Sequence, residues 1–361
     1  MLSVVSPLAR RKGSRTLDAQ LFDALITTPG ISGREERIRS IVKKSIEGLV
    51  DEIRVDRLGN VIGIRRGGGP RVMLCAHIDT IGFLVSHIED EGFLRISPVG
   101  GFDARTLVNQ QVLVQGTEDF IGLLSPGEPP VHLQPKGESK KELKIKDLFV
   151  DLMIPAQEVK AKVKVGDPTS LYRHPVVTDR VVTAPYLDDR LGVYVLVEVL
   201  RRLSQTPAEL YAVFSVQEEV GVRGAKTSAF EIQPDIGVAV DVTIANDIPG
   251  AEKAQRGAIL GDGMSINVMD ALSISDPRLI QRFAELSEKL GLSYQREVFP
   301  SGGTDAGGIQ LSRAGVPAIT ISVPTRYVHT VNEMALVSDI EGTIEVLVGF
   351  LSDDRELNLD W

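Results

Sequence analysis

The sequence predicts an α/β fold with a mixed, mostly parallel sheet flanked by helices, and with a small β-barrel-like domain inserted into it. Two observations lead to this prediction. In the first and last parts of the chain, short apolar runs of strand length alternate with helical patterns, which is typical of parallel sheets. Between them, over residues 81–183, glycine, proline and charged residues separate short apolar runs, which indicates a β-rich unit.

The composition is that of a globular protein with two domains. A chain of 361 residues is too long for one ordinary core, and 43% hydrophobic and 25% charged residues are usual values. The net charge of −9 argues against a nucleic-acid partner, because phosphate binding needs a basic surface. No apolar run is long enough to span a membrane. The single cysteine, Cys75, rules out an internal disulfide and fits a reducing compartment. We expect a cytoplasmic location because the sequence shows no clear targeting signal.

The N-terminal region begins with a basic segment and continues into two helices. Residues 1–16 contain four basic residues and no acid, and we interpret them as a disordered tail, although a targeting peptide has a similar composition. Apolar residues at helical spacing from Leu17 onward predict a helix that ends near Thr28. Ser32 with Glu35 three residues later is the capping-box pattern of a second helix.

Three strands are predicted next, over residues 53–56, 61–64 and 72–76. The third strand is apolar and ends in His77-Ile78-Asp79. His77 and Asp79 lie two residues apart, so their side chains share one face if the chain stays extended. A histidine that binds a metal through one nitrogen usually donates its other N–H to a carboxylate. This stretch alone is consistent with a metal site and with an ordinary polar strand end.

The predicted insertion contains apolar runs over residues 112–114, 120–124 and 148–153, which we expect to be strands of a small barrel. The charged stretch over residues 136–146 is interpreted as a mobile surface loop. The predicted domains are therefore residues 17–80 with 184–361, and the insertion 81–183.

Adjacent carboxylates follow at two places. Asp188 and Asp189 open a strongly apolar helix, where one acid suffices as a cap and a second adds repulsion unless a cation is near. Glu218 and Glu219 follow the apolar strand over residues 210–216, and by themselves they could be a solvated pair. Another apolar strand, over residues 236–240, ends in Asp241.

The last stretch with candidate functional residues runs from residue 301 to His329. Residues 301–308 are rich in glycine and could cradle a phosphate, but no P-loop lysine or dinucleotide fingerprint accompanies them. A strand over residues 318–323 then leads to His329. A single histidine after a strand usually has a structural role.

The candidate histidines and acids share one kind of position. Each follows a short apolar strand or lies at the start of the helix between two such strands. In open α/β sheets, sites form at the carboxyl ends of parallel strands, so we expect the side chains to converge. Four carboxylates in one crevice would repel one another, and two divalent cations would balance them. Imidazole and carboxylate ligands suit zinc, with cobalt or manganese also suitable. The residues thus predict a two-metal hydrolase that uses a metal-held hydroxide and a glutamate as general base.

These motifs together resemble those of the tetrahedral, or glutamyl, aminopeptidases, a family of zinc-peptidase-like enzymes with two metal ions that includes deblocking aminopeptidases. The resemblance covers the chain from about Leu17 onward. It rests on six stretches in the family's order, which are Ala76-His77-Ile78-Asp79, Asp188-Asp189-Arg190, Gln217-Glu218-Glu219-Val220-Gly221, Asp241-Val242-Thr243, Gly302-Gly303-Thr304-Asp305-Ala306-Gly307 and Pro324-Thr325-Arg326-Tyr327-Val328-His329. It implies a metal-dependent aminopeptidase that removes N-terminal residues from short peptides.

The resemblance also implies a role for each residue. Asp188 would bridge both metals, His77 and Asp241 would complete one site, and Glu219 and His329 the other. Glu218 would be the general base, and Asp79 would orient the histidine. The residues expected to line the substrate pocket are Gly303, Thr304, Asp305 and Arg326. Subunits are expected to self-associate through the inserted domain, as dimers or tetrahedral dodecamers, without nucleic-acid or membrane partners.

Three alternatives remain at this point. A two-metal amidase or deacylase acting on a small N-acylated substrate would need the same ligands and a different pocket. A glycoside hydrolase would need two metal-free carboxylates and would keep its activity in chelator. A non-catalytic binding protein could retain the fold, although the intact ligands and base argue against it. Thr80 stands where many relatives carry glutamate, which leaves the substrate preference open.

Overall fold

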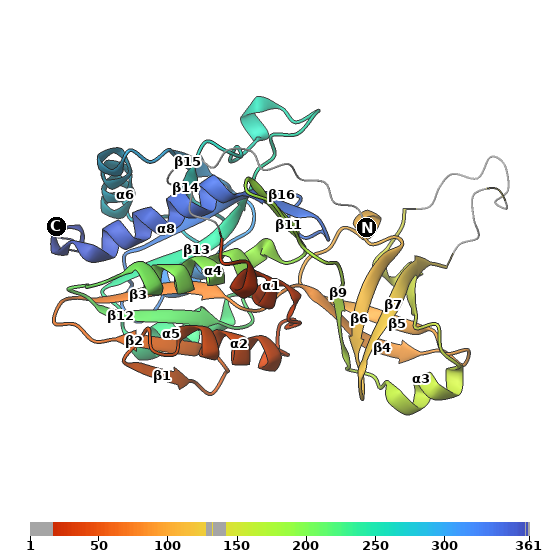
Figure 1. Ribbon diagram of the computed structural model, residues 1–361. Helices are drawn as coiled ribbons and strands as arrows, with labels where there is room; N and C mark the ends of the chain where they lie inside the picture. The colour runs from red at the N-terminus through yellow and green to blue at the C-terminus, as the bar shows by residue number, and fades with distance from the viewer. Residues whose placement is uncertain (1–16, 128–131, 133–141, 358, 360–361) are drawn as a thin grey trace.

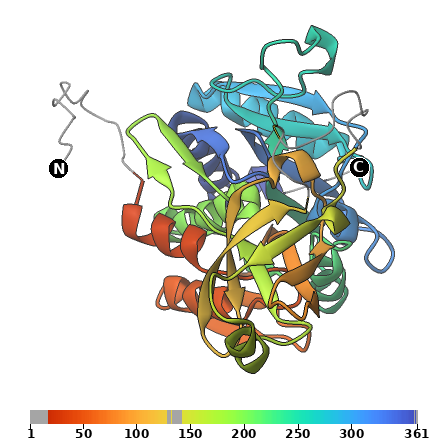
Figure 2. The same cartoon turned by 90° about the vertical axis from the view of Figure 1, so that its right-hand side faces the viewer.

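The computed structural model describes residues 17–127, 132, 142–357 and 359. The predicted tail, residues 1–16, and most of the predicted loop 136–146 lie outside the described residues. The described chain forms an α/β unit and, beside it, a closed β-barrel (Figure 1). Figure 2 views the molecule from the barrel, whose strands cross in front of the α/β unit. A mixed α/β fold with a barrel-like second sheet was the sequence prediction, and it is confirmed.

The large sheet of the α/β unit is mixed. Its strands in spatial order are β1 (Glu52–Val55), β2 (Val61–Arg65), β12 (Glu209–Ser215), β3 (Arg71–His77), β13 (Ile236–Ile244), β16 (Ala318–Arg326), β17 (Glu333–Leu336), β11 (Val181–Ala184) and β10 (Val176–Val177). β14 (Met264–Met269) pairs with β16 and with β15 (Tyr294–Val298). The central strands β12, β3, β13 and β16 pair in parallel, whereas the outer strands β1, β2, β17, β11 and β10 pair antiparallel. The parallel centre therefore brings several strand carboxyl ends to one edge.

Helices cover both faces of this sheet. Along β3, Leu74 belongs to one hydrophobic core and its neighbour Cys75 to another, because successive side chains of a strand point to opposite faces. The first core is formed with α1 (Ala19–Thr27), α2 (Glu36–Ile46), α4 (Leu187–Arg202), α6 (Pro277–Leu290) and α8 (Val337–Ser352). The second is formed with α5 (Arg223–Ile232) and α7 (Asp305–Gln310). Burial on both faces explains why these strands are continuously apolar.

The start of α2 differs from the sequence prediction. Glu35 is the N-cap residue and makes no capping hydrogen bond, so the predicted capping box is absent. Ser32 instead donates its hydroxyl to Asp79 Oδ2 at 2.6 Å. The serine therefore fixes a residue at the end of β3, and the helix begins without it.

Glu35 gives a testable pH dependence of stability. Its side chain is buried, and burial together with the charge of Asp79 raises its pKa to about 7 from 4.5. Since the folded pKa is raised, ionised Glu35 costs stability as the pH rises from 4.5 to about 7, and this cost is absent at lower pH. Replacing Glu35 with glutamine should therefore raise the free energy of unfolding more at pH 8 than at pH 5. The difference between the two effects should be at most about 3 kcal/mol.

Thermal unfolding midpoints of wild type and Glu35→Gln at both pH values test this expectation. Glu36→Gln, at the exposed neighbouring position, is the matched control and should show no such difference between the two pH values. An equal effect of Glu35→Gln at both pH values would contradict the assignment.

The barrel closes in the strand order β4 (Gly82–Ile88), β5 (Leu94–Val99), β8 (Leu148–Asp151), β7 (Asp119–Pro126), β6 (Gln110–Gln115) and β9 (Pro168–Leu171), and α3 (Ala156–Lys162) lies beside it. Its core is separate from those of the α/β unit. All six strands fall inside the predicted insertion, whereas β10 and β11 pair within the large sheet. The domain limits themselves stay predictions.

Short 3-10 turns complete the described structure, at Ala104–Thr106, Ile145–Asp147, Lys253–Gln255 and Asp354–Leu357. None of the helices in the described ranges is both long enough and apolar enough to cross a membrane.

Candidate active site

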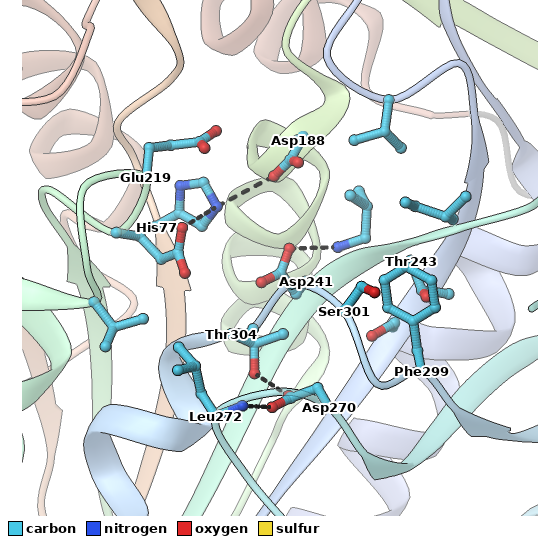
Figure 3. Close-up of a pocket in the computed structure, with 18 of the residues that line it drawn as sticks. His77, Asp188, Glu219, Asp241, Thr243, Asp270, Leu272, Phe299, Ser301 and Thr304 are labelled. Carbon is cyan, nitrogen blue, oxygen red and sulfur yellow. Dashed lines mark hydrogen bonds and ion pairs between the residues drawn. The ribbon is translucent and has the colours of Figure 1, made fainter. Parts of the chain in front are cut away.

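A pocket of about 420 Å³ lies at the carboxyl ends of the central parallel strands. Its walls include the five predicted metal ligands and the predicted general base, which are His77, Asp188, Glu218, Glu219, Asp241 and His329. Figure 3 shows His77, Asp188, Glu219 and Asp241 at one end of this pocket, pointing toward one another. Each comes from a different element, so the convergence depends on the sheet order.

The elements place each side chain in a simple way. His77 is the last residue of β3, and its main chain pairs with the last residue of β12. Glu218 and Glu219 follow β12 after a bend at Gln217, which has a φ of 57°. Asp188 lies at a non-helical kink near the start of α4. Asp241 was expected to end its strand, but β13 continues to Ile244.

Two groups of side chains share Asp188. His77, Asp188 and Asp241 form one group, and Asp188, Glu219 and His329 form the other; the potential ligand atoms of each lie within 4.8 Å of one another. His77 Nε2 is 3.2 Å from Asp188 Oδ1, and His329 Nε2 is 3.3 Å from Asp188 Oδ2. Each histidine therefore faces a different oxygen of one carboxylate.

The site concentrates negative charge in a buried place. Burial and the nearby charge of Asp188 raise the pKa of Glu219 to about 8, and burial raises the pKa values of Glu218 and Asp241 well above their usual range. Against the effect of burial, hydrogen bonds from His329 and His77 hold the pKa of Asp188 below its usual range. Burial and mutual repulsion therefore favour the binding of protons or cations by these carboxylates.

Comparison with known proteins identifies the family. Residues 59–346 match the family described as M42 glutamyl aminopeptidase. The chain belongs to this family. A lysyl aminopeptidase from Pyrococcus furiosus is 33% identical over 358 residues, which cover 95% of this chain and 99% of the relative. The resemblance inferred from the motifs is thereby confirmed. The M42 protein is a hydrolase that acts as an exopeptidase, and peptidases of this family depend on metal.

Solved structures agree with the assignment. An aminopeptidase from the archaeon Desulfurococcus kamchatkensis superposes with a TM-score of 0.88 at 36% identity, covering 92% of this chain and 94% of that one. The TET1 peptidase of Pyrococcus horikoshii, which can assemble into a tetrahedron or a large octahedral shell, gives a TM-score of 0.82 at 30% identity. The superposition covers 92% of the M42 protein and 99% of that peptidase.

In the M42 protein, Asp79 contacts the site through both its main chain and its carboxylate. The Asp79 carbonyl oxygen lies 3.0 Å from His77 Nδ1, whereas its carboxylate is 3.7 Å from the same nitrogen. The carboxylate accepts hydrogen bonds from the backbone N–H groups of Glu218 at 2.9 Å and Glu219 at 3.2 Å. Asp79 thus connects the histidine at the end of β3 with the glutamate pair after β12.

Sequence reasoning missed one further carboxylate of this kind, Glu333, and it noted Asp189 without assigning it a role. Glu333 is 1% exposed and accepts hydrogen bonds from the backbone N–H groups of Asp188 at 2.9 Å and His329 at 2.6 Å. Asp189 accepts from the backbone N–H of His77 at 3.2 Å and caps the helix at Gly192. The adjacent acids of α4 therefore have different roles. Asp188 lines the pocket, whereas Asp189 accepts hydrogen bonds from backbone N–H groups. Glu333 gave no signal in the sequence.

The four residues expected to bind substrate occupy different places. Gly303 and Thr304 line the pocket. Asp305 lies behind the pocket wall, buried, and accepts hydrogen bonds from Ser215 Oγ and, at 3.2 Å, from Cys75 Sγ. Arg326 pairs with Asp247, with 2.5 Å between Nη2 and Oδ2, and is not among the residues of the pocket wall.

The glycine-rich stretch serves packing at the pocket wall. A Cβ at Gly307 would lie 2.6 Å from Leu272 Cβ, and one at Gly303 would lie 2.4 Å from Leu272 Cδ1. Both distances are too short for a side chain, so the glycines leave room for Leu272, which also lines the pocket. Packing therefore explains these two glycines without a phosphate.

Proposed function

We propose that this M42 protein removes N-terminal residues from short peptides, with two divalent metal ions held by His77, Asp188, Glu219, Asp241 and His329. The arrangement of Asp188 carries the proposal, because its two oxygens face two different histidines at 3.2 and 3.3 Å. A carboxylate in this position suits a ligand shared by two ions. Zinc fits imidazole and carboxylate ligands best, and cobalt or manganese are also suitable.

Two observations support the binding of two cations by these side chains. Glu219 Oε1 is buried and has no hydrogen-bond partner in the described part of the chain, so it is available as a ligand atom. Asp188, Glu218, Glu219 and Asp241 would carry four negative charges, which two divalent ions would balance. The side chains left without a metal would have to hold protons instead, as their raised pKa values indicate.

When bound, the ions would supply a water of lowered pKa as nucleophile and a Lewis acid for the peptide carbonyl. The chain itself supplies the base. Glu218 belongs to neither ligand group, and its Oε2 lies 3.8 Å from His77 Nε2, beside the first group. It would take a proton from the attacking water and deliver it to the leaving amine. The hydrogen bond from its backbone N–H to Asp79 fixes the position of its main chain.

Self-association is the second part of the proposal. The TET1 peptidase of Pyrococcus horikoshii assembles into closed shells, and the fold of this chain superposes on it over nearly its full length. The barrel exposes apolar side chains, with Met153 at 59% and Val165 at 63% exposure. We propose that barrel contacts join subunits into a dimer, or into a tetrahedral dodecamer. A cytoplasmic location stays a prediction from the sequence.

Release of amino acids from matched peptides tests the activity. Free and N-acetylated versions of the same short peptides are incubated with chelator-treated protein, and again after zinc, cobalt or manganese is restored. We expect release only from free N-termini and only with metal. Cleavage of the acetylated peptides would favour a deacylase, and activity that persists in chelator would contradict the metal assignment. If the protein bound metal but released no amino acid with any of the three metals, a non-catalytic binding protein would be favoured.

A further inference from the structure

Two segments that carry proposed metal ligands are anchored in the core of the barrel. Tyr186 lies two residues before Asp188, and Val331 lies two residues after His329. Both belong to the hydrophobic cluster of the barrel core, where they are 6% and 3% exposed. Neither belongs to a barrel strand, because Tyr186 lies between β11 and α4, and Val331 lies between β16 and β17. The α/β unit therefore contributes two side chains to the barrel core, each close in the chain to a ligand.

The Tyr186 hydroxyl is bonded to the backbone of the barrel. It accepts a hydrogen bond from the N–H of Leu171 and donates one to the carbonyl oxygen of the same residue at 3.3 Å. Leu171 is the last residue of β9, a strand that pairs with β4 and β6. Core packing on the ring and two hydrogen bonds on the hydroxyl leave the side chain little freedom. The barrel sheet therefore fixes the position of Tyr186.

The backbone of both segments adopts a conformation that needs such contacts. Tyr186 has a φ of 65° and His329 a φ of 64°, in the left-handed region that residues other than glycine seldom adopt. This conformation costs free energy and persists only where the surrounding structure holds it. Glu333 holds the two segments from the α/β side, through the N–H groups of Asp188 and His329. Tyr186 and Val331 hold the same segments from the barrel side.

The inserted segment also reaches the pocket itself. Gly101, which follows β5, lines the pocket, and a Cβ at this position would lie 3.7 Å from His329 Nδ1. By contrast, His77 and Asp241 lie on β3 and β13, which have a neighbouring strand on each side in the large sheet. The barrel contacts at Tyr186, Val331 and Gly101 therefore act on Asp188 and His329, whereas the large sheet fixes the other two residues.

We propose that the barrel core positions the metal ligands, with Tyr186 as the positioning residue for Asp188 and Val331 as that for His329. The inference rests on the proposed function. The Tyr186 hydroxyl would hold the start of α4 against β9, so that the two oxygens of Asp188 face His77 and His329. Loss of either contact would let a ligand move, and a displaced ligand binds metal less tightly.

Tyr186→Phe tests the hydroxyl, because it removes one oxygen atom and keeps the ring in the barrel core. We expect the affinity for metal, measured by competition with a chelator, to fall about 10-fold. Both ions should be affected, because Asp188 is common to the two ligand groups. The visible absorption spectrum of the cobalt-loaded protein should also change, since it depends on the arrangement of the ligands. With a free peptide, kcat should fall more than KM changes.

Tyr194→Phe is the matched control for the loss of a buried hydroxyl. Tyr194 is 1% exposed, lies in the same helix, and accepts a hydrogen bond from the N–H of Asp18 at 2.9 Å, outside the pocket wall. Both variants should lower the unfolding midpoint. Only Tyr186→Phe should change the affinity for metal and the cobalt spectrum.

Val331→Ala tests the other contact and keeps the inference falsifiable if Tyr186→Phe does not fold. It should weaken the ion in the group of His329 more than the other ion. Val150→Ala, which truncates a fully buried valine of the same core, should leave both affinities unchanged. Wild-type affinity and cobalt spectrum in Val331→Ala and in folded Tyr186→Phe would overturn the inference. A wild-type protein that binds no metal, or releases no N-terminal residue, would refute the proposed function instead.

Discussion

Replacing Glu218 with glutamine is expected to lower kcat by about 100- to 10,000-fold while both metal ions remain bound. Glutamine has the size of glutamate, and its backbone N–H would keep the hydrogen bond to Asp79. It cannot take up the proton of the attacking water or return it to the leaving amine. Since Glu218 belongs to neither ligand group, the affinity for metal should change little.

Kinetics on a peptide with a free N-terminus, with metal content measured on the same samples, distinguish a general base from a metal ligand. Glu219→Gln is the instructive neighbour, because Glu219 belongs to the group with Asp188 and His329, and its variant should lose metal as well as activity. Glu285→Gln, at an exposed position on α6, should behave as wild type. Wild-type kcat in fully loaded Glu218→Gln would refute the assignment of the general base.

The sequence allowed the centre of the site to be predicted because of how a parallel sheet is built. Strands buried on both faces are continuously apolar, so a polar side chain at their ends stands out. His77, Glu218 and Glu219 were found in this way, and sheet order brought them together as expected. Asp241 was found for the same reason, although β13 extends beyond it.

Other residues could not be placed by periodicity, because their positions depend on partners far away in the chain. Thr304 caps α7 and lines the pocket, whereas Asp305, the next residue, turns back to Ser215 and Cys75. The long side chain of Arg326 reaches Asp247, which lies in a loop that no sequence pattern positions. The residues expected to bind substrate were therefore harder to predict than ligands at strand ends, because their side chains turn to partners far away in the chain.

Glu333→Gln is expected to weaken metal binding by about 10- to 100-fold, although Glu333 does not line the pocket. Its two carboxylate oxygens accept from the backbone N–H groups of Asp188 and His329, which lie in different elements. A glutamine side chain offers one oxygen, so one of these N–H groups would face an NH₂ group instead. The change would release either the residue proposed to bridge the ions or the histidine beside it.

Metal affinity, measured by competition with a chelator, distinguishes this role from a purely structural one. Asp339→Asn is the matched control, because Asp339 is equally buried and accepts from a backbone N–H at Gly261, outside the pocket wall. Both variants should lower the unfolding midpoint, but only Glu333→Gln should lower the affinity for metal. Equal affinities in the two variants would refute the role. If Glu333 acts through Asp188, both ions should weaken together, because Asp188 is common to the two ligand groups.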